Sequence, residues 1–440
     1  MIKNKPIIFK FQNGATLIYQ KRKLCEATAI NAGFWAGHYY IDKIQGMPHF
    51  VEHLLFKGTN NRTENQIIED EVNITNISAS TGPYSINVGF FESNKKIEEC
   101  FEFSSDILLN TKIDESVLEK EKQVVFEERE RAKDKVLKNI FEQQFRFMEK
   151  NFKLFEDYRL GTNETLGKAT KKDVQEFINK HFVCDKFFMV VASSLSFRRI
   201  KKLAKKYFIN KLVVPTNSSQ LIPYQKFYLE NNEGVNFIKN VDNTITGIIS
   251  IKFEVDDGEK LKDDYNISCL IADINTQADS FYNQARKEGL VYTAGASVNY
   301  NNLSTSMTID FDFTTSKIEN VDKLISFIGD TIKLYKTKAI STDAIEKHKE
   351  KAIISLDKSF PSKYRETVSS LQYEYYKYKK FDIVTKKERI KSFKKVNIDS
   401  IKEYINLIFN DKNKVFITFM GNINESDFKT IDEYKKLIFK

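Results

Sequence analysis

Two histidines four residues apart are the feature of this sequence most suggestive of chemistry. His49 and His53 lie in the segment GMPHFVEHLLFKG, with Glu52 directly before the second, in a chain that has only five histidines in 440 residues. Pro48 suits the first turn of a helix and Gly58 suits the position just past its end. Residues four apart on a helix project from one face, so both imidazoles could reach one metal ion. Glu52 would lie beside that face, within reach of a water molecule without being a ligand itself.

A catalytic zinc ion needs three protein ligands and one open position. The segment IDESVLEKEKQVVFEERERAKD, residues 113–134, reads as a long helix that Asp114 opens. Glu121 and Glu128 are seven residues apart in it, nearly two helical turns, so they stack along one face. The same side carries the predicted core-facing stripe of Val117, Val124 and Val125. Carboxylates beside such a stripe are costly unless they are paired or bind a metal, so this helix is a candidate source of the third ligand.

The spacing alone leaves other interpretations open. His49 and His53 could be two buried imidazoles with satisfied hydrogen bonds, and Glu121 and Glu128 could be exposed members of a charged helix. The remaining histidines lie outside the HxxEH segment and have no second histidine near them in sequence, which favours surface or packing roles for His38, His181 and His348.

The order HxxEH, followed after residues 54–127 by a helix of the form E-x6-E, resembles the pitrilysin/insulinase family of inverted-zincin metallopeptidases. The resemblance is to the two-domain, short-chain type found in bacterial peptidases and mitochondrial processing peptidase subunits. It implies one zinc ion per chain, with His49, His53 and Glu128 as ligands. It further implies that Glu52 is the general base and that Glu121 is a second catalytic acid supporting the ligand shell. Further matches cover most of the chain, in FQNGATLIYQ, HFVEHLLFKGTNNRTENQI and LGTNETLGKATKKDVQEFINKHFVCDKFFMVVAS.

The resemblance also implies where a substrate binds. FYNQARKEGLVYTAG resembles the second-half segment whose Arg and Tyr face the substrate, which points to Arg286 and Tyr292. Ser78 and Ala79 lie on the segment that resembles the cleft strand, where an extended peptide would add a further strand.

This substrate side departs from the family pattern. Residues 78–81 read Ser-Ala-Ser-Thr without the usual Asn, and INTQADSFYNQ lacks the usual Gly pair. Arg286 stands six residues before Tyr292, where seven is usual. Arg286 could therefore be a solvated helix-end residue and Tyr292 a core strand tyrosine.

The organisation of the chain predicts an α+β fold of two tandem homologous domains, each a mostly antiparallel sheet packed with helices. The stretch VVPTNSSQLIPY near the midpoint has the Pro and polar residues of a linker. Each half opens with alternating strand-like segments and closes with a helix followed by an apolar strand. No regular βαβ alternation supports a doubly wound sheet. We expect a zinc-bearing catalytic domain over 1–214, a linker over 215–223, and a second domain over 224–440 that contributes to the substrate chamber.

Composition excludes several classes of function. The excess of 69 basic over 60 acidic residues gives a net charge of +9, but it is spread along the chain, which disfavours a nucleic-acid interface. No apolar run approaches a membrane span, and the first twenty residues lack the apolar core of a signal peptide. The four cysteines are far apart and form no CxxC pair, which fits a reducing compartment. The sequence therefore predicts a cytoplasmic protein.

These features predict a zinc endopeptidase that hydrolyses short or unstructured peptides, with leader-peptide processing as one option. Family resemblance implies that one chain forms half of a closed chamber, so we expect a homodimer or a heterodimer with a related subunit. The alternative is a non-catalytic peptide-binding or scaffold subunit. Such subunits usually lose motif residues, whereas His49, Glu52, His53 and Glu128 are all present here.

Overall fold

The protein is described here by a computed structural model, in which the chain forms two compact units. Unit 1 comprises residues 1–131, 153–226 and 357–386, and unit 2 comprises residues 132–152, 227–356 and 387–440. The structure describes residues 6–22, 26–38, 44–137, 139–148, 159–215, 232–254, 260–276, 279–300, 306–337, 342–359, 368, 371 and 386–440.

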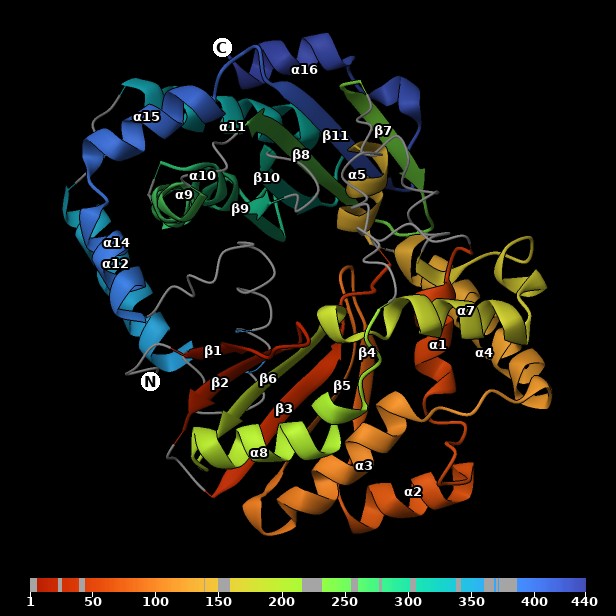
Figure 1. The fold of residues 1–440 in the computed structure, drawn as a ribbon. Coiled ribbons are helices and arrows are strands. Elements are labelled where there is room, and N and C mark those ends of the chain that lie inside the picture. The colour runs from red at the N-terminus through yellow and green to blue at the C-terminus, as the bar shows by residue number, and fades with distance from the viewer. Residues whose placement is uncertain are drawn as a thin grey trace. The chain divides into compact units, whose positions relative to one another are not determined.

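Unit 1 is built on a six-stranded sheet with the order β1-β2-β6-β3-β5-β4 (Figure 1). Its strands are β1 (Ile7–Lys10), β2 (Thr16–Lys21), β3 (Ala27–Phe34), β4 (Ser78–Thr81), β5 (Ile86–Ser93) and β6 (Phe187–Ser193). Neighbouring strands are antiparallel except β2 and β6, which are parallel. The short strand β4 ends the sheet at one edge.

Helices cover one face of this sheet and enclose the larger core of unit 1. They are α1 (Met47–Leu54), α2 (Glu64–Asn73), α3 (Ile97–Leu109), α4 (Glu115–Leu137), α7 (Lys171–His181) and α8 (Phe197–Tyr207). Figure 1 shows α3 and α8 lying across the sheet, and α1 contacts β4 and β5. On the opposite face, Ile18 and Phe188 form a smaller core with Val368 and Leu371, and Trp35 stacks on Phe188 at a ring distance of 4.1 Å.

Unit 2 contains a five-stranded sheet with the order β7-β11-β8-β10-β9. Its strands are β7 (Gly234–Lys239), β8 (Ile245–Glu254), β9 (Thr293–Tyr300), β10 (Ser306–Thr315) and β11 (Lys414–Gly421). Its helices are α5 (Ile140–Met148), α9 (Lys260–Thr276), α10 (Phe281–Lys287), α11 (Glu319–Thr337), α12 (Thr342–Ser359), α14 (Lys386–Lys395), α15 (Ile398–Ile408) and α16 (Ile431–Ile438).

The two sheets repeat one topology. In each, one strand runs parallel to the strand that closes the unit (β2 with β6, β7 with β11), and three antiparallel pairings follow to the far edge. The sheet of unit 1 has one further strand, β1, which pairs antiparallel with β2. The predicted α+β fold of two similar halves is thus confirmed, including the closing helix and strand, α7–β6 and α15–β11.

The two units are not two consecutive halves of the sequence, because two segments belong to the unit formed mainly by the other half. Helix α5 belongs to unit 2, where the Gln144 amide donates to the Phe416 carbonyl oxygen at 2.8 Å. Residues 357–386 belong to unit 1, as the packing of Val368 shows. Most of the predicted linker, residues 216–223, lies outside the described residues, and the predicted domain limits stay a prediction.

The described cysteines Cys100, Cys184 and Cys269 are buried and unpaired, and Cys25 lies outside the described part. No helix in the described ranges is long and apolar enough to cross a membrane.

Glycine fixes the start of α1. Gly46 is the N-cap with φ of +80°, a left-handed conformation that side chains rarely adopt. A Cβ placed on it would lie 2.4 Å from the backbone nitrogen of Gly161, so the backbone itself would have to move. The helix that follows is shorter than predicted: it ends at Leu54, and residues 55–57 form a turn before Gly58, whose φ is +127°.

We predict that Gly46→Ala lowers the free energy of unfolding by about 2 kcal/mol or more, because it adds left-handed strain to a backbone clash. Urea titration followed by circular dichroism measures this change. Gly82→Ala is the matched control, since no heavy atom lies within 4 Å of its Cβ position. Equal losses in the two variants would contradict the prediction.

Candidate metal centre

One face of helix α1 is buried in the core, and the other carries the two histidines. Phe50, Val51 and Leu54 are at most 1% exposed and belong to the core of unit 1. His49 and His53 lie on the remaining face, with side chains 17% and 15% exposed. Burial of the apolar face therefore fixes the direction in which the two imidazoles point.

Helix α4 brings the acids to this face. Asp114 accepts hydrogen bonds from the backbone N–H and hydroxyl of Ser116, as expected for the residue that opens the helix. Val125 is fully buried, but Val124 is 38% exposed, so its predicted place on the core-facing stripe is wrong. The buried stripe runs through Leu118, Glu121 and Val125, at helical spacing, and Val124 lies beside it.

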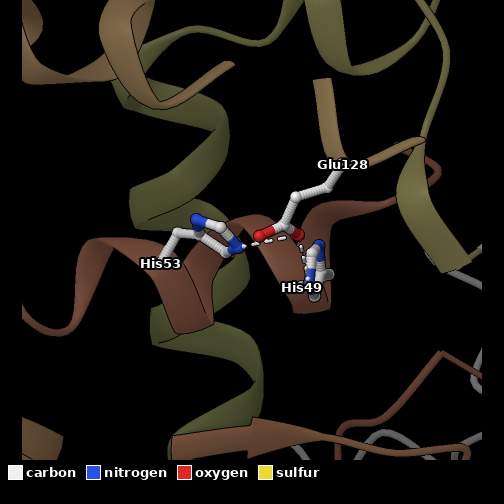
Figure 2. A group of neighbouring side chains, drawn as sticks. All are labelled: His49, His53 and Glu128. Carbon is white, nitrogen blue, oxygen red and sulfur yellow. Dashed lines mark ion pairs between the residues drawn. The ribbon is translucent and has the colours of Figure 1, made fainter. Parts of the chain in front are cut away.

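The predicted ligands converge. The Nε2 atoms of His49 and His53 lie 3.6 and 3.5 Å from the same oxygen of Glu128, Oε2. Figure 2 shows the Glu128 carboxylate reaching toward both rings, whose centroids are 4.7 Å apart. One ligand atom from each residue can be chosen so that all three lie within 4.8 Å of one another.

These three residues fit a zinc ion. A tetrahedral site with bonds of about 2.0–2.1 Å places its ligand atoms about 3.4 Å apart, close to the two nitrogen–oxygen distances here. Burial lowers the pKa of His49 to about 4, with His53 and Arg159 adding to the effect. Its imidazole is therefore neutral at neutral pH, which is the form that binds metal.

A second layer of charges holds His53 in place. Its Nδ1 lies 3.3 Å from Oε2 of Glu121, which is only 6% exposed. A carboxylate on the far nitrogen of a histidine ligand fixes the ring orientation and makes the ligand more basic. Lys57 Nζ lies 2.9 Å from Glu121 Oε1 and 2.9 Å from Glu64 Oε1, so it links the second layer to α2.

Glu52 lies beside the three predicted ligands, as expected for a base. Burial raises the pKa of its carboxyl group, although hydrogen bonds with Thr81 oppose this rise. The Thr81 hydroxyl also donates to the carbonyl oxygen of Pro48 at 3.3 Å, which ties β4 to α1.

Sequence reasoning missed Lys57, Thr81 and Arg159 as parts of the site. Lys57 and Thr81 stand within or beside segments already singled out, and Lys57 follows His53 by one helical turn. Arg159 has no comparable signal, because only the fold brings it near His49.

The predicted substrate residues Ser78 and Ala79 lie on the edge strand β4. Among the described strands, β4 pairs only with β5, and the Ser78 hydroxyl donates to the Gly89 carbonyl oxygen at 3.4 Å. Ala79 and Glu52 both line a cavity of about 400 Å³ beside the candidate metal centre.

The other predicted substrate residues, Tyr292 and Arg286, belong to unit 2. Tyr292 directly precedes β9 and is 71% exposed, so it is not a core strand tyrosine. Arg286 lies in the last turn of α10, where it donates to the Tyr282 hydroxyl at 2.9 Å. Substrate binding by these four residues stays a prediction.

Comparison with known proteins identifies the family of this chain. A family model described as insulinase (peptidase family M16) matches residues 29–157, the range that contains His49, His53 and Glu128. A second, described as the peptidase M16 inactive domain, matches residues 168–352. The chain belongs to peptidase family M16.

The M16 relatives with curated names include peptidase subunits and zinc proteases. The chain is 25% identical over 332 residues to the mitochondrial-processing peptidase subunit beta of Neurospora crassa, covering 72% of this chain and 68% of that protein. It is 28% identical over 204 residues to an uncharacterized zinc protease of Rickettsia felis, covering 46% of this chain and 49% of the relative. The match thus spans only about half of the Rickettsia protein.

Solved structures share the fold. A protease from Helicobacter pylori matches with a TM-score of 0.73 at 16% identity, covering 95% of this chain and 99% of that one. The periplasmic protease PqqL from Escherichia coli matches with a TM-score of 0.80 at 14% identity, covering all of this chain and 50% of that one. At these identities the likeness concerns the fold alone.

We predict that Glu121→Gln weakens zinc binding about 10- to 100-fold, because the partner of His53 loses its charge. Competition with a chromophoric chelator measures the dissociation constant. Glu127→Gln is the matched control on the same helix, where the side chain is 69% exposed and, among the described residues, forms an ion pair with Arg131 alone. Unchanged zinc affinity in Glu121→Gln would contradict a supporting role.

Proposed function

We propose that this M16 protein is a zinc-dependent endopeptidase that hydrolyses short or unstructured peptides. The observation that carries the proposal is the convergence of His49, His53 and Glu128, with Glu52 beside them. A bound zinc ion would supply a Lewis acid that lowers the pKa of a water molecule to about 7 and polarises the scissile carbonyl.

The residues of the chain would divide the remaining work. Glu52 takes a proton from the attacking water and later delivers it to the leaving amine. Its carboxyl group is buried enough to hold a proton between the two steps, as the direction of its pKa shift indicates. Glu121 and Lys57 keep His53 oriented throughout.

The edge strand β4 would position the peptide. An extended substrate can add to an exposed strand edge through main-chain hydrogen bonds, which suits peptides that lack structure. Thr81 joins β4 to α1, so a peptide aligned on Ser78 and Ala79 is also aligned on Glu52. Tyr292 and Arg286 are further residues proposed to contact a peptide substrate.

We further propose that the working form is a dimer, either of two identical chains or with a related subunit, that encloses the substrate in a chamber. The support is the name of the Neurospora relative, which is one subunit of a processing peptidase. Leader-peptide processing is one activity that such an assembly could have, and a cytoplasmic location fits the three unpaired cysteines.

The alternative function is a non-catalytic peptide-binding subunit. The description "inactive domain" applies to residues 168–352, which contain no HxxEH motif. The HxxEH motif and the third predicted ligand, Glu128, lie before that range. His49, Glu52, His53 and Glu128 are all present there. This favours the enzyme over the scaffold.

We predict that Glu52→Gln abolishes peptide hydrolysis, with a loss of 10³-fold or more, while zinc is retained, because the substitution removes the base and leaves the ligands intact. The measurement is mass-spectrometric detection of cleavage in a pool of unstructured peptides, with zinc content determined in parallel. Equal cleavage by the parent and by Glu52→Gln would refute the assignment of Glu52. Absence of cleavage by the zinc-loaded parent, alone and with co-purifying partners, would favour the scaffold.

A further inference from the structure

A cationic surface lies at the edge of the unit 1 sheet that is opposite the candidate metal centre. Strand β1 ends the sheet at one edge, and β4, which contacts α1, ends it at the other. Helix α8 covers the β1 side, where the Phe197 ring packs on Phe9 of β1 and Tyr19 of β2. Lys201 Nζ lies 3.6 Å from the centre of the Phe9 ring. This surface is therefore separate from the residues proposed for catalysis.

The outer face of α8 carries cations without acidic partners. Arg198, Lys202 and Lys205 are exposed, and among the described residues none of them forms an ion pair. Lys206, by contrast, pairs with Glu98 on the neighbouring α3 at 2.7 Å. Positions 198, 202 and 205 follow one another at intervals of about one turn, so their side chains lie on one face of the helix. These three residues, the α8 stripe, form a line of uncompensated positive charge.

Strand β1 offers main-chain hydrogen-bonding groups next to the α8 stripe. Phe197 and Lys201, which contact Phe9 of β1, directly precede two residues of the stripe in sequence. Among the described strands β1 pairs only with β2, so its outer edge is unpaired within that part of the chain. Ile7 is 43% exposed and lies on the same face of β1 as Phe9. The surface thus combines an open strand edge, an exposed apolar side chain and unpaired cations.

We propose that β1 and α8 form a docking surface for an extended, acidic segment of a partner protein. The segment adds to the outer edge of β1 as a further strand, and its Asp or Glu side chains pair with the α8 stripe. Ile7 packs on an apolar side chain of the same segment. Strand β1 has only four residues and is a weak site for pairing by itself, so the charges of the stripe supply the selectivity.

Two other anionic partners fit this surface less well. The apolar side of α8, with Ile200, Leu203 and Ala204, is buried in the core of unit 1, so the helix has no apolar face to insert into a membrane. A nucleic acid would have no use for the open strand edge, and three cations in one short line make a small electrostatic footprint. An acidic polypeptide uses both the edge and the charges.

Fluorescence anisotropy of a labelled peptide in which Glu alternates with Thr tests the proposal. The protein is the zinc-loaded full-length chain carrying Glu52→Gln, so that the probe is not cleaved. We expect saturable binding that weakens as salt is added, and no binding of the matching peptide that has Lys in place of Glu. Methylation of alternate backbone nitrogens weakens binding about tenfold in one register and little in the other, because only every second N–H of an added strand faces β1.

Charge reversal locates the binding surface. We expect the triple variant of the stripe to bind the Glu peptide about tenfold more weakly or worse, because each lost ion pair becomes a repulsion. The substitutions are Arg198→Glu, Lys202→Glu and Lys205→Glu. Circular dichroism checks that the variant is folded, and Gln at the same three positions gives a smaller loss in the same direction.

The matched control makes the same change in net charge on unit 2 and keeps the parental affinity. It reverses three exposed lysines that form no ion pair within the described ranges, Lys333→Glu, Lys336→Glu and Lys402→Glu. Equal losses in the two triple variants would reduce the effect to net charge and overturn the proposal.

Three further results would overturn it. The first is the absence of saturable binding of the Glu peptide, and the second is equal affinity for the two methylated peptides and the unmethylated one. The third is stripe-dependent binding of single-stranded DNA, or of vesicles of phosphatidylcholine and phosphatidylserine in equal parts, without binding of the Glu peptide. None of these outcomes bears on the proposed peptidase activity, because the probe is followed by binding alone and at a separate surface.

Discussion

The meeting of α1 with α4 is the constraint on which the rest of the site depends. Helices far apart in sequence bring the Nε2 atoms of two imidazoles to 3.5–3.6 Å from one carboxylate oxygen of Glu128. Helix α1 has only eight residues and would not be stable without its packing against the rest of unit 1. Its position is fixed by Phe50, Val51 and Leu54 in the core and by the close approach of Gly46 to Gly161. Packing energy is thus what keeps the polar groups together.

Polar contacts then continue outward from that meeting point. His53 contacts Glu121, Glu121 contacts Lys57, and Lys57 contacts Glu64 on the wall of the adjacent cavity. The buried carboxylate of Glu121 thus has an oppositely charged partner in Lys57, which offsets the cost of removing it from water. The chain of contacts also joins the candidate metal centre to the cavity, so the same charges that orient a ligand shape the surface a substrate side chain would meet.

Much of this could be predicted from the sequence because it depends on local periodicity. The spacing of His49 and His53, the stacking of Glu121 and Glu128, and the helix-then-strand ending of each half follow from helical and strand repeats. What failed depends on tertiary contacts. Val124 was expected in the core, but the buried side of α4 is decided by its neighbours. The assignment of α5 to unit 2 could not be seen either, since it rests on contacts such as that of Gln144 with Phe416.

The central claim is that His49, His53 and Glu128 together bind one zinc ion. X-ray absorption spectroscopy of the zinc-loaded full-length chain, with metal content measured on the same sample, tests it most directly. The account predicts one zinc per chain with two imidazole ligands and otherwise oxygen ligands. It also predicts loss of the imidazole signal when both histidines are replaced by alanine. An imidazole signal that survives this double substitution, or zinc well below one per chain at saturation, would contradict it.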